Sequence, residues 1–269
     1  MSYKPCTIDY QVHSFRSHDG LATIREQCLR AVELGLDEIG FTEHKDFDPL
    51  DPVVIHFDYD LYGKEIEAAR SEFDGQLIIR KGIEIDYQRW FEDEIGLYLR
   101  QHQFDFVMGC VHHIDRVMVM SSEYLSTRDR DTSYRDYFRA VTDSAKTGLF
   151  DIIGHLEYAN RRGVPAFGPY DANRYRDELT DLFGIMLEKN ALLEINSAGI
   201  RYHSGGTYPS LRTVELYVEF GGNTVTFGSD AHEPAYLAAD FDRAREVARS
   251  AGIKQLATFS DRTPAFNPI

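Results

Sequence analysis

The stretch Val-Thr-Phe-Gly-Ser-Asp-Ala-His, residues 225–232, begins as an apolar, β-favouring run and ends with a carboxylate and an imidazole two residues apart. Side chains alternate between the two faces of a β-strand. If extended geometry continues to the end of the stretch, Asp230 and His232 therefore point the same way. A carboxylate and an imidazole directed into one space form a metal-ligand pair. The stretch predicts a metal site at the carboxyl end of a strand.

Other β-favouring runs are predicted at residues 7–13, 36–41, 76–85, 104–111, 150–153 and 191–195. Most of them also end in side chains that bind metals, so that the chain places the following residues at predicted strand ends: His13, His44, Glu84, His112, His113, His155, Asp230 and His232. The carboxyl ends of the strands are where α/β barrels place their active sites. Six of the ten histidines fall at this one predicted rim, which is more than chance placement gives.

Helical patterns lie between the strands, at residues 21–34, 59–73, 92–102, 134–146, 173–189, 210–220 and 234–251. In the first of them, Thr23 and Glu26 have the spacing of a capping box, and Gly35 predicts the end of the helix. Residues 46–57, 116–132 and the segment from Arg161 to Pro165 are predicted to be loops, and 255–259 a closing strand.

Strand and helix thus alternate about seven times with no low-complexity linker, which predicts one α/β domain over residues 1–269 with a parallel sheet and helices outside. A single (β/α) barrel is the preferred architecture at this length, and an open doubly wound sheet is the alternative.

The composition limits the partners. The formal net charge is −15, which argues against binding of a long nucleic acid through a basic surface. The three cysteines, Cys6, Cys28 and Cys110, lack CxxC spacing, which indicates a reducing compartment. Residues 1–5 contain no apolar signal core and no run is long enough to span a bilayer, so we expect a cytoplasmic protein without a membrane partner. The sequence alone does not define an oligomeric state.

The metal-binding side chains are too numerous for one ion. Imidazole and carboxylate ligands without thiolates suit Zn, Fe or Mn. Two or three divalent ions, bridged by a carboxylate such as Glu84, would use the whole set.

In order along the chain, these strand ends resemble the motifs of the polymerase and histidinol phosphatase (PHP) superfamily of metal-dependent phosphoesterases, and in particular its histidinol-phosphate phosphatases. The pieces that carry the resemblance are Asp-Tyr-Gln-Val-His (9–13), Phe-Thr-Glu-His (41–44), Gly-Ile-Glu (82–84), Val-His-His-Ile-Asp (111–115), Gly-His-Leu-Glu (154–157), Glu-Ile-Asn-Ser-Ala-Gly-Ile-Arg (194–201) and Gly-Ser-Asp-Ala-His (228–232). The resemblance implies a distorted barrel of seven βα units.

The resemblance also implies three metal positions. The first would use His13, Glu84 and Asp230, and the second would use Glu84, His112 and His155. The third would use His44, His232 and a loop ligand, which is Asp19 by position, with His18 adjacent as the alternative. The chain departs from the family pattern at Gln11, where the first motif His-x-His has its first histidine. Gln11 is therefore expected as a weaker, neutral ligand or as a sign that this position is weakened.

The implied activity is hydrolysis of L-histidinol phosphate to L-histidinol and phosphate, in histidine biosynthesis, by a hydroxide that bridges two ions and attacks phosphorus. The other predicted roles belong to residues near the strand ends. Arg201 and one of the adjacent pair Arg161 and Arg162 are expected to bind the phosphate. His113 is expected to protonate the leaving alkoxide or to orient a ligand. Asp115 or Asp19 is expected to meet the cationic part of the substrate, and Asn196 to line the site.

Two other functions remain open at this stage. One is a related phosphoesterase that acts on a nucleotide, an oligonucleotide or a sugar phosphate. The other is a metal-binding member that has lost catalysis, which the substitution at Gln11 suggests.

Overall fold

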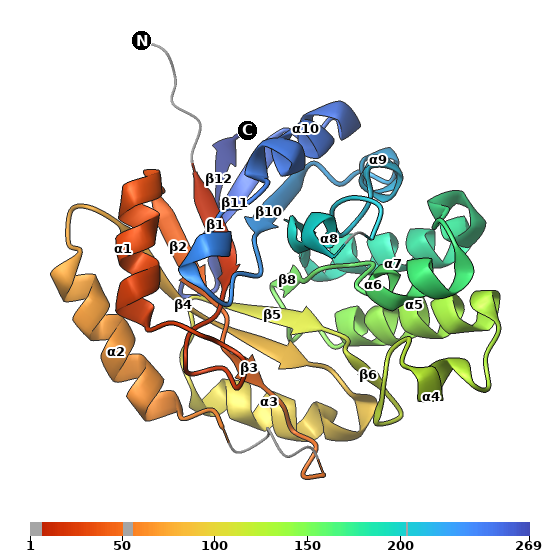
Figure 1. Ribbon diagram of the computed structural model, residues 1–269, viewed down its shortest axis with the longest axis horizontal. Helices are drawn as coiled ribbons and strands as arrows, with labels where there is room; N and C mark the ends of the chain where they lie inside the picture. The colour runs from red at the N-terminus through yellow and green to blue at the C-terminus, as the bar shows by residue number, and fades with distance from the viewer. Residues whose placement is uncertain (1–6, 51–55, 203) are drawn as a thin grey trace.

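The structure is a computed structural model that describes residues 7–50, 56–202 and 204–269 (Figure 1). Its main sheet has ten strands in the order β1-β2-β4-β5-β8-β9-β10-β11-β12, with β3 paired to β4. Neighbours are parallel from β1 to β11, and β12 is antiparallel to β11. The strands span Ile8–Val12 (β1), Glu38–Phe41 (β2), His44–Lys45 (β3), Ile78–Asp86 (β4), Phe106–Cys110 (β5), Ile152–Ile153 (β8), Leu192–Asn196 (β9), Thr224–Gly228 (β10), Gln255–Ser260 (β11) and Thr263–Pro268 (β12).

The seven parallel strands from β1 to β10 close on themselves. Just after β10, Ala231 forms a parallel bridge with Val12 of β1, and the His13 N–H donates to the Ala231 carbonyl at 2.9 Å. At the other end of the barrel, β11 pairs with the start of β10, and the Phe259 N–H donates to the Tyr10 hydroxyl at 2.8 Å. The predicted α/β fold with a mostly parallel sheet is confirmed, and this closure makes it a distorted barrel rather than an open sheet.

Helices surround the barrel, with α1 and α2 on one side in Figure 1 and α5, α7 and α9 on the other. They span Ile24–Leu34 (α1), Tyr59–Glu72 (α2), Glu92–Gln101 (α3), Ser122–Leu125 (α4), Arg130–Lys146 (α5), Asn160–Phe167 (α6), Arg176–Lys189 (α7), Ala198–Arg201 (α8), Leu211–Glu219 (α9) and Phe241–Ala251 (α10). The capping box of Thr23 and Glu26 is present, and Gly35 ends α1 in the left-handed conformation. The capping box and the glycine therefore mark the two ends of this helix, as the sequence predicted.

Two predicted loops are more ordered than expected. Residues 116–132 contain strand β7 (Val117–Met118), which pairs with β6 (His113–Ile114), then α4 and the start of α5. The segment after β8 is the helix α6, although it contains Pro165. This helix packs against α5 at Gly163, where a Cβ would lie 2.4 Å from the Tyr134 hydroxyl oxygen. Glycine often indicates a loop, but Gly163 is needed here because a side chain would collide with Tyr134 of α5.

The last predicted helix is also interrupted. A 3₁₀ turn at Pro234–Tyr236 precedes α10, and Ala238 and Asp240 between them have positive φ angles. The chain breaks here because the Ala238 N–H donates to the buried carboxylate of Asp9 at 2.9 Å instead of to a helical carbonyl.

Cys28 and Cys110 are buried free thiols, and Cys6 lies outside the described residues. Among the residues that the structure describes, no helix is both long and apolar enough to cross a lipid bilayer.

Close packing at the end of β10 gives a stability prediction. A Cβ on Gly228 would lie 1.8 Å from the Glu194 Oε1 atom and 2.7 Å from the Gln11 Cβ atom. Gly228→Ala should therefore destabilise the protein by about 1–3 kcal/mol, as overpacking of a core does. Gly184→Ala on α7, where the added Cβ meets nothing within 4 Å, is the control and should stabilise by about 0.5–1 kcal/mol. Thermal unfolding of both variants tests this, and an unchanged stability of Gly228→Ala would contradict it.

Candidate active site

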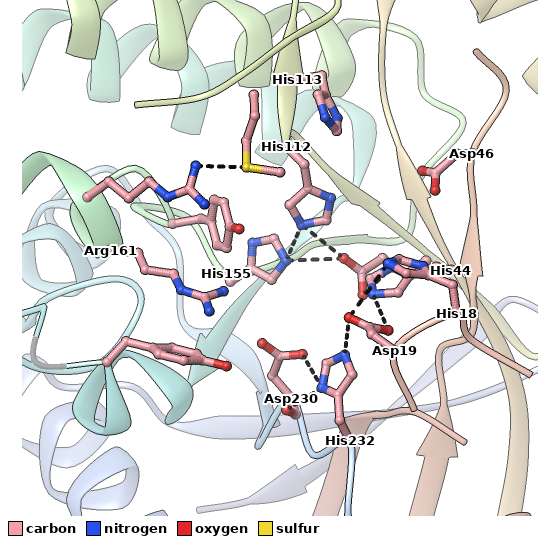
Figure 2. A pocket seen from close by; sticks show the side chains of 15 residues that line it. His18, Asp19, His44, Asp46, His112, His113, His155, Arg161, Asp230 and His232 are labelled. Carbon is pink, nitrogen blue, oxygen red and sulfur yellow. Dashed lines mark hydrogen bonds and ion pairs between the residues drawn. The ribbon is translucent and has the colours of Figure 1, made fainter. Parts of the chain in front are cut away.

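A cavity of about 620 Å³ opens at the carboxyl ends of the barrel strands. Figure 2 shows its side chains converging from several strand ends. The lining residues are His18, Asp19, His44, Asp46, Glu84, His112, His113, Met118, His155, Tyr158, Arg161, Arg162, Tyr202, Asp230 and His232. The strand ends that the sequence marked thus surround one space, as the barrel geometry requires.

Three ligand atoms on one side of the cavity have the spacing of a metal site. The Glu84 Oε1 atom lies 3.2 Å from His155 Nε2 and 3.4 Å from His112 Nε2, and the two imidazole nitrogens lie 3.2 Å apart. Ligand atoms that share one tetrahedral zinc with bonds of about 2.0–2.1 Å lie roughly 3.3–3.4 Å apart. This triangle fits the second predicted metal position.

The other oxygen of Glu84 belongs to a second set. His13 Nε2 lies 3.4 Å from Glu84 Oε2 and 3.3 Å from Asp230 Oδ1. His13 is fully buried, and its Nε2 has no hydrogen-bond partner within the described part of the chain. These three residues fit the first predicted position, and Glu84 is placed to bridge the two positions.

Asp19 joins the histidines of the third predicted position. Its carboxylate oxygens lie 3.1 Å from His232 Nε2 and 3.7 Å from His44 Nε2. The His44 and His232 rings both stack on the His13 ring, with centroids 4.4 and 4.2 Å away. His18 also lines the cavity, but its ring centroid lies 5.4 Å from that of His44, so Asp19 is the better-placed loop ligand.

Metal binding requires neutral imidazoles and ionised carboxylates, which the pKa shifts of His44, His112 and Glu84 favour and the raised pKa values of His13 and His155 oppose. Burial lowers the pKa of His44 to about 3, and burial also lowers the pKa of His112. Burial alone would raise the pKa of Glu84, but the surrounding imidazoles hold it well below its usual range. Burial opposes the charge of His155, yet Glu84 raises the His155 pKa to about 8. A proton there would have to leave when a metal ion binds.

Residues behind the cluster fix its imidazoles. His13 Nδ1 lies 3.1 Å from Ser17 Oγ, which donates to the Glu43 carboxylate at 2.7 Å. His113 Nδ1 lies 2.8 Å from Asp86 Oδ2. Carboxylates in this position orient ligands and raise their basicity. Sequence reasoning did not assign Ser17, Glu43 or Asp86, although Glu43 and Asp86 stand inside or beside the quoted motifs.

Cys110 also lies close to Glu84 and His155, near enough to be a ligand. Burial raises the pKa of its thiol well above the usual range. The thiol is buried and does not line the cavity, whereas Glu84 and His155 do.

Asp230 and His232 reach the cavity by a different path from the one expected. Strand β10 ends at Gly228, and Asp230 has a φ of 52°. Extended geometry therefore does not continue through the stretch. The two side chains still meet, with His232 Nδ1 3.6 Å from Asp230 Oδ1, because the Ala231 bridge to β1 turns both toward His13.

The two adjacent arginines both line the cavity. Arg161 is half-buried with its guanidinium 3.7 Å from the Tyr202 ring centroid. Arg162 is exposed and its Nη1 lies 2.8 Å from the Met118 sulfur. Arg201 does not line the cavity, because its Nη2 donates to the carbonyls of Ser229 and Asp230 at 2.8 and 3.1 Å. These two hydrogen bonds stabilise the backbone turn at Asp230.

Two predicted substrate-binding residues lie elsewhere. Asp115, in the turn between β6 and β7, is exposed and pairs with Arg89 at 3.2 Å outside this cavity. Asn196 is fully buried, and both ends of its amide bond protein atoms. Neither side chain is placed to contact a ligand in the cavity.

The model of the PHP domain family matches residues 9–198, which is more than half of the chain. The chain belongs to the PHP domain family. Histidinol-phosphatase from Lactococcus lactis is 28% identical over 271 residues, covering 94% of each chain. A probable histidinol-phosphatase from Deinococcus radiodurans is 29% identical, covering 91% of this chain and 93% of the relative.

A crystal structure of the L. lactis histidinol phosphate phosphatase, in complex with zinc, L-histidinol and phosphate, superposes on this PHP domain with a TM-score of 0.85. The two chains are 27% identical in that alignment, which covers 96% of this chain and 98% of the other. The fold is therefore shared along nearly the whole length of both chains.

Gln11, which stands where the family motif has its first histidine, forms hydrogen bonds at both ends of its amide. Its Nε2 donates to Glu84 Oε2 at 2.8 Å, and its Oε1 accepts a hydrogen bond from Asn196 Nδ2. The backbone fixes this direction, because the Ala198 N–H donates to Asn196 Oδ1 at 2.8 Å and leaves only Nδ2 to face Gln11. An amide nitrogen has no lone pair for a metal. In this geometry Gln11 donates to the carboxylate of Glu84, and its amide oxygen is directed to Asn196.

A variant of Gln11 separates these two roles. Gln11→Met should bind the same number of zinc ions at saturation as the unaltered PHP domain, with an affinity about 10-fold weaker, as when a partner of a ligand is lost. Gln11→His adds an imidazole and should retain zinc longest against a chelator. Elemental analysis after equilibrium dialysis gives both results. A count lower by one zinc in Gln11→Met at saturation would show that Gln11 is a ligand.

Proposed function

We propose that this PHP domain is a metal-dependent phosphomonoesterase that hydrolyses L-histidinol phosphate to L-histidinol and phosphate, a step of histidine biosynthesis. The observation that carries the proposal is the bridging geometry of Glu84, with one oxygen in each of two ligand sets. The similarity to histidinol-phosphatases over more than nine-tenths of the chain supports the choice of substrate. We treat residues 1–269 as one catalytic domain.

The ligand sets fit two or three divalent ions, and imidazole with carboxylate suits Zn, Mn or Fe. Bound ions supply a lowered pKa of water and stabilise the charge that develops on a phosphoryl group. Glu84 would hold an ion on each of its oxygens, and Asp19 and Asp230 would be the remaining carboxylate ligands. Gln11, which replaces the motif histidine, donates a hydrogen bond to Glu84. The substitution therefore leaves Glu84 in its position between the two ligand sets.

Arg161 is the residue best placed to bind the phosphate. Its guanidinium is held between the rings of Tyr202 and Tyr158, at 3.7 and 6.0 Å from their centroids. A guanidinium fixed in this way can bond two phosphate oxygens at once with little further loss of freedom. Arg162 lines the same cavity but is exposed to solvent.

His113 is proposed as the proton donor to the leaving alkoxide. His113 lines the cavity, and the contact between its Nδ1 and Asp86 orients the ring. Proton transfer by an imidazole at the leaving oxygen removes the need to expel a free alkoxide.

The direct test joins metal counting to turnover. The protein would be purified without chelator, its metals counted by elemental analysis, and phosphate release from L-histidinol phosphate measured with Mn, Zn, Fe or Co. We expect two or three ions per chain and release that is selective over nucleotides and sugar phosphates. Selective release from another ester would move the assignment to that substrate. Bound metal without turnover on any ester would leave only a metal-binding member.

Substitution of each arginine tests their unequal roles. Arg161→Met should lower kcat/KM for L-histidinol phosphate by about 10²–10³-fold, as loss of an oriented electrostatic group does. Arg162→Met, the matched neighbour, should change it by less than about fivefold because its charge is exposed and screened. Steady-state kinetics with equal metal content in both variants measures the difference, and equal losses would contradict the assignment.

A further inference from the structure

Asp9 is a fully buried carboxylate of β1 that does not line the cavity. Its Oδ1 atom accepts hydrogen bonds from the Ser229 N–H at 2.9 Å and the Gln11 N–H at 3.4 Å. Its Oδ2 atom accepts hydrogen bonds from the Ser229 hydroxyl and from the Ala238 N–H at 2.9 Å. None of these four donors carries a positive charge. A buried carboxylate without a charged partner is costly, so the position of Asp9 needs a physical explanation.

The donors show which part of the chain Asp9 holds. Ser229 and Ala238 lie on either side of the segment that carries Asp230 and His232, whose side chains Figure 2 shows together at the cavity. Both ends of this ten-residue segment, 229–238, are therefore hydrogen-bonded to one carboxylate. Asp9 closes the loop that carries two of the predicted metal ligands.

The backbone at Asp230 depends on such support. Its φ of 52° is left-handed, and residues other than glycine keep this conformation only where their surroundings fix it. Ser229, on one side of Asp230, is bound by the Asp9 side chain, and Ala231, on the other side, accepts a hydrogen bond from the His13 N–H at 2.9 Å. Asp230 is thus held between two attachments to β1 and the residue that follows this strand.

The hydrogen-bond pattern requires a carboxylate at this position. A backbone N–H can only donate, and the Ser229 and Ala238 N–H groups face different oxygens of Asp9. An asparagine has one amide oxygen and one NH₂ group. In Asp9→Asn the NH₂ group would therefore face one of these two N–H donors and leave it without an acceptor.

We infer that Asp9 is a positioning residue that sets the affinity of the metal ions bound by Asp230 and His232. The ion between Glu84, His112 and His155 takes no ligand from the 229–238 segment, so its affinity should not depend on Asp9. This rests on the proposed function, because that proposal places divalent ions in the cluster. Asp9 acts through the backbone of the loop and contacts neither substrate nor ion.

The test is a zinc titration of Asp9→Asn by equilibrium dialysis against graded chelator, with elemental analysis. Zinc that depends on Asp230 or His232 should bind about 10–100-fold more weakly, as when a group that orients a ligand is lost. One zinc ion per chain should keep the affinity that it has in the unaltered protein. An equal loss of all ions, or an unchanged titration, would overturn the inference.

Asp105→Asn is the matched control for the loss of a buried carboxylate. Asp105 lies just before β5, at the opposite end of that strand from His112, and accepts hydrogen bonds from the Lys81 and Asp261 N–H groups at 2.7 and 3.3 Å. Thermal unfolding of the metal-free proteins should show that both substitutions lower the stability, whereas only Asp9→Asn changes the zinc titration. The same selective zinc loss in Asp105→Asn would overturn the inference, because general destabilisation would then explain it.

Ser229→Ala gives a milder form of the same change. It removes the hydroxyl donor and keeps the N–H donor, so it should weaken the same zinc ions by a smaller factor even if Asp9→Asn does not fold. In the double variant the two losses should be smaller than their sum, because both act through one contact. Fully additive losses, or no effect of Ser229→Ala on zinc, would contradict this route.

Zinc binding is measured without turnover, which separates this inference from the substrate assignment. If Asp9→Asn loses zinc selectively but the unaltered protein does not hydrolyse L-histidinol phosphate, the inference stands and the assignment fails. If the ester is hydrolysed and the zinc titration of Asp9→Asn is unchanged, the assignment stands and the inference fails. With both correct, excess zinc should restore most of the kcat of Asp9→Asn, because the substitution lowers occupancy and leaves the reacting groups in place.

Discussion

Glu84 is a fully buried carboxylate whose two oxygens face different sets of imidazole nitrogens. A buried charge is costly unless it is paired and hydrogen-bonded. Imidazoles on both sides of Glu84 offset this cost, His13 at one oxygen and His112 with His155 at the other. The Gln11 amide donates a further hydrogen bond. The remaining ligands are arranged around this one group, so its position decides where any ion can lie.

The barrel places Glu84 and its partners through strand register. His44 in β3 stands opposite Glu84 in β4, and the Glu84 N–H donates to the Glu43 carbonyl at 3.1 Å. The Val12–Ala231 bridge brings the end of the last barrel strand to the first, and so carries Asp230 and His232 to His13. Residues separated by more than two hundred positions meet because the sheet closes, which is the link between the fold and the chemistry.

Much of this could be predicted from the sequence, since strand ends in a parallel barrel share one rim. The α/β class, the capping of α1 and the convergence of His13, Glu84 and His155 depend only on local pattern and on that rule. Asp115 shows the limit, because a residue can follow a strand end closely and still lie in a hairpin turn that leads away from the cavity. The helix α6 was missed because Gly163 and Pro165 are local helix breakers, whereas its packing on Tyr134 is a long-range contact. The direction of the Gln11 amide could not be predicted either, since it is set by a backbone N–H nearly two hundred residues away.

The pKa values of the buried carboxylates are shifted in different directions, according to the groups that face each of them. Burial raises the pKa of Glu194 to about 8, of Glu157 to about 7 and of Asp9 to about 6. Burial acts on Glu84 in the same direction, but the imidazoles around it reverse the result. Environments that push neighbouring carboxyl groups apart in pKa assign them different roles. Glu194 lies close behind the cluster, where it accepts a hydrogen bond from the His155 N–H at 2.6 Å. Glu194 therefore stabilises the turn that carries His155, while burial disfavours a second negative charge beside Glu84.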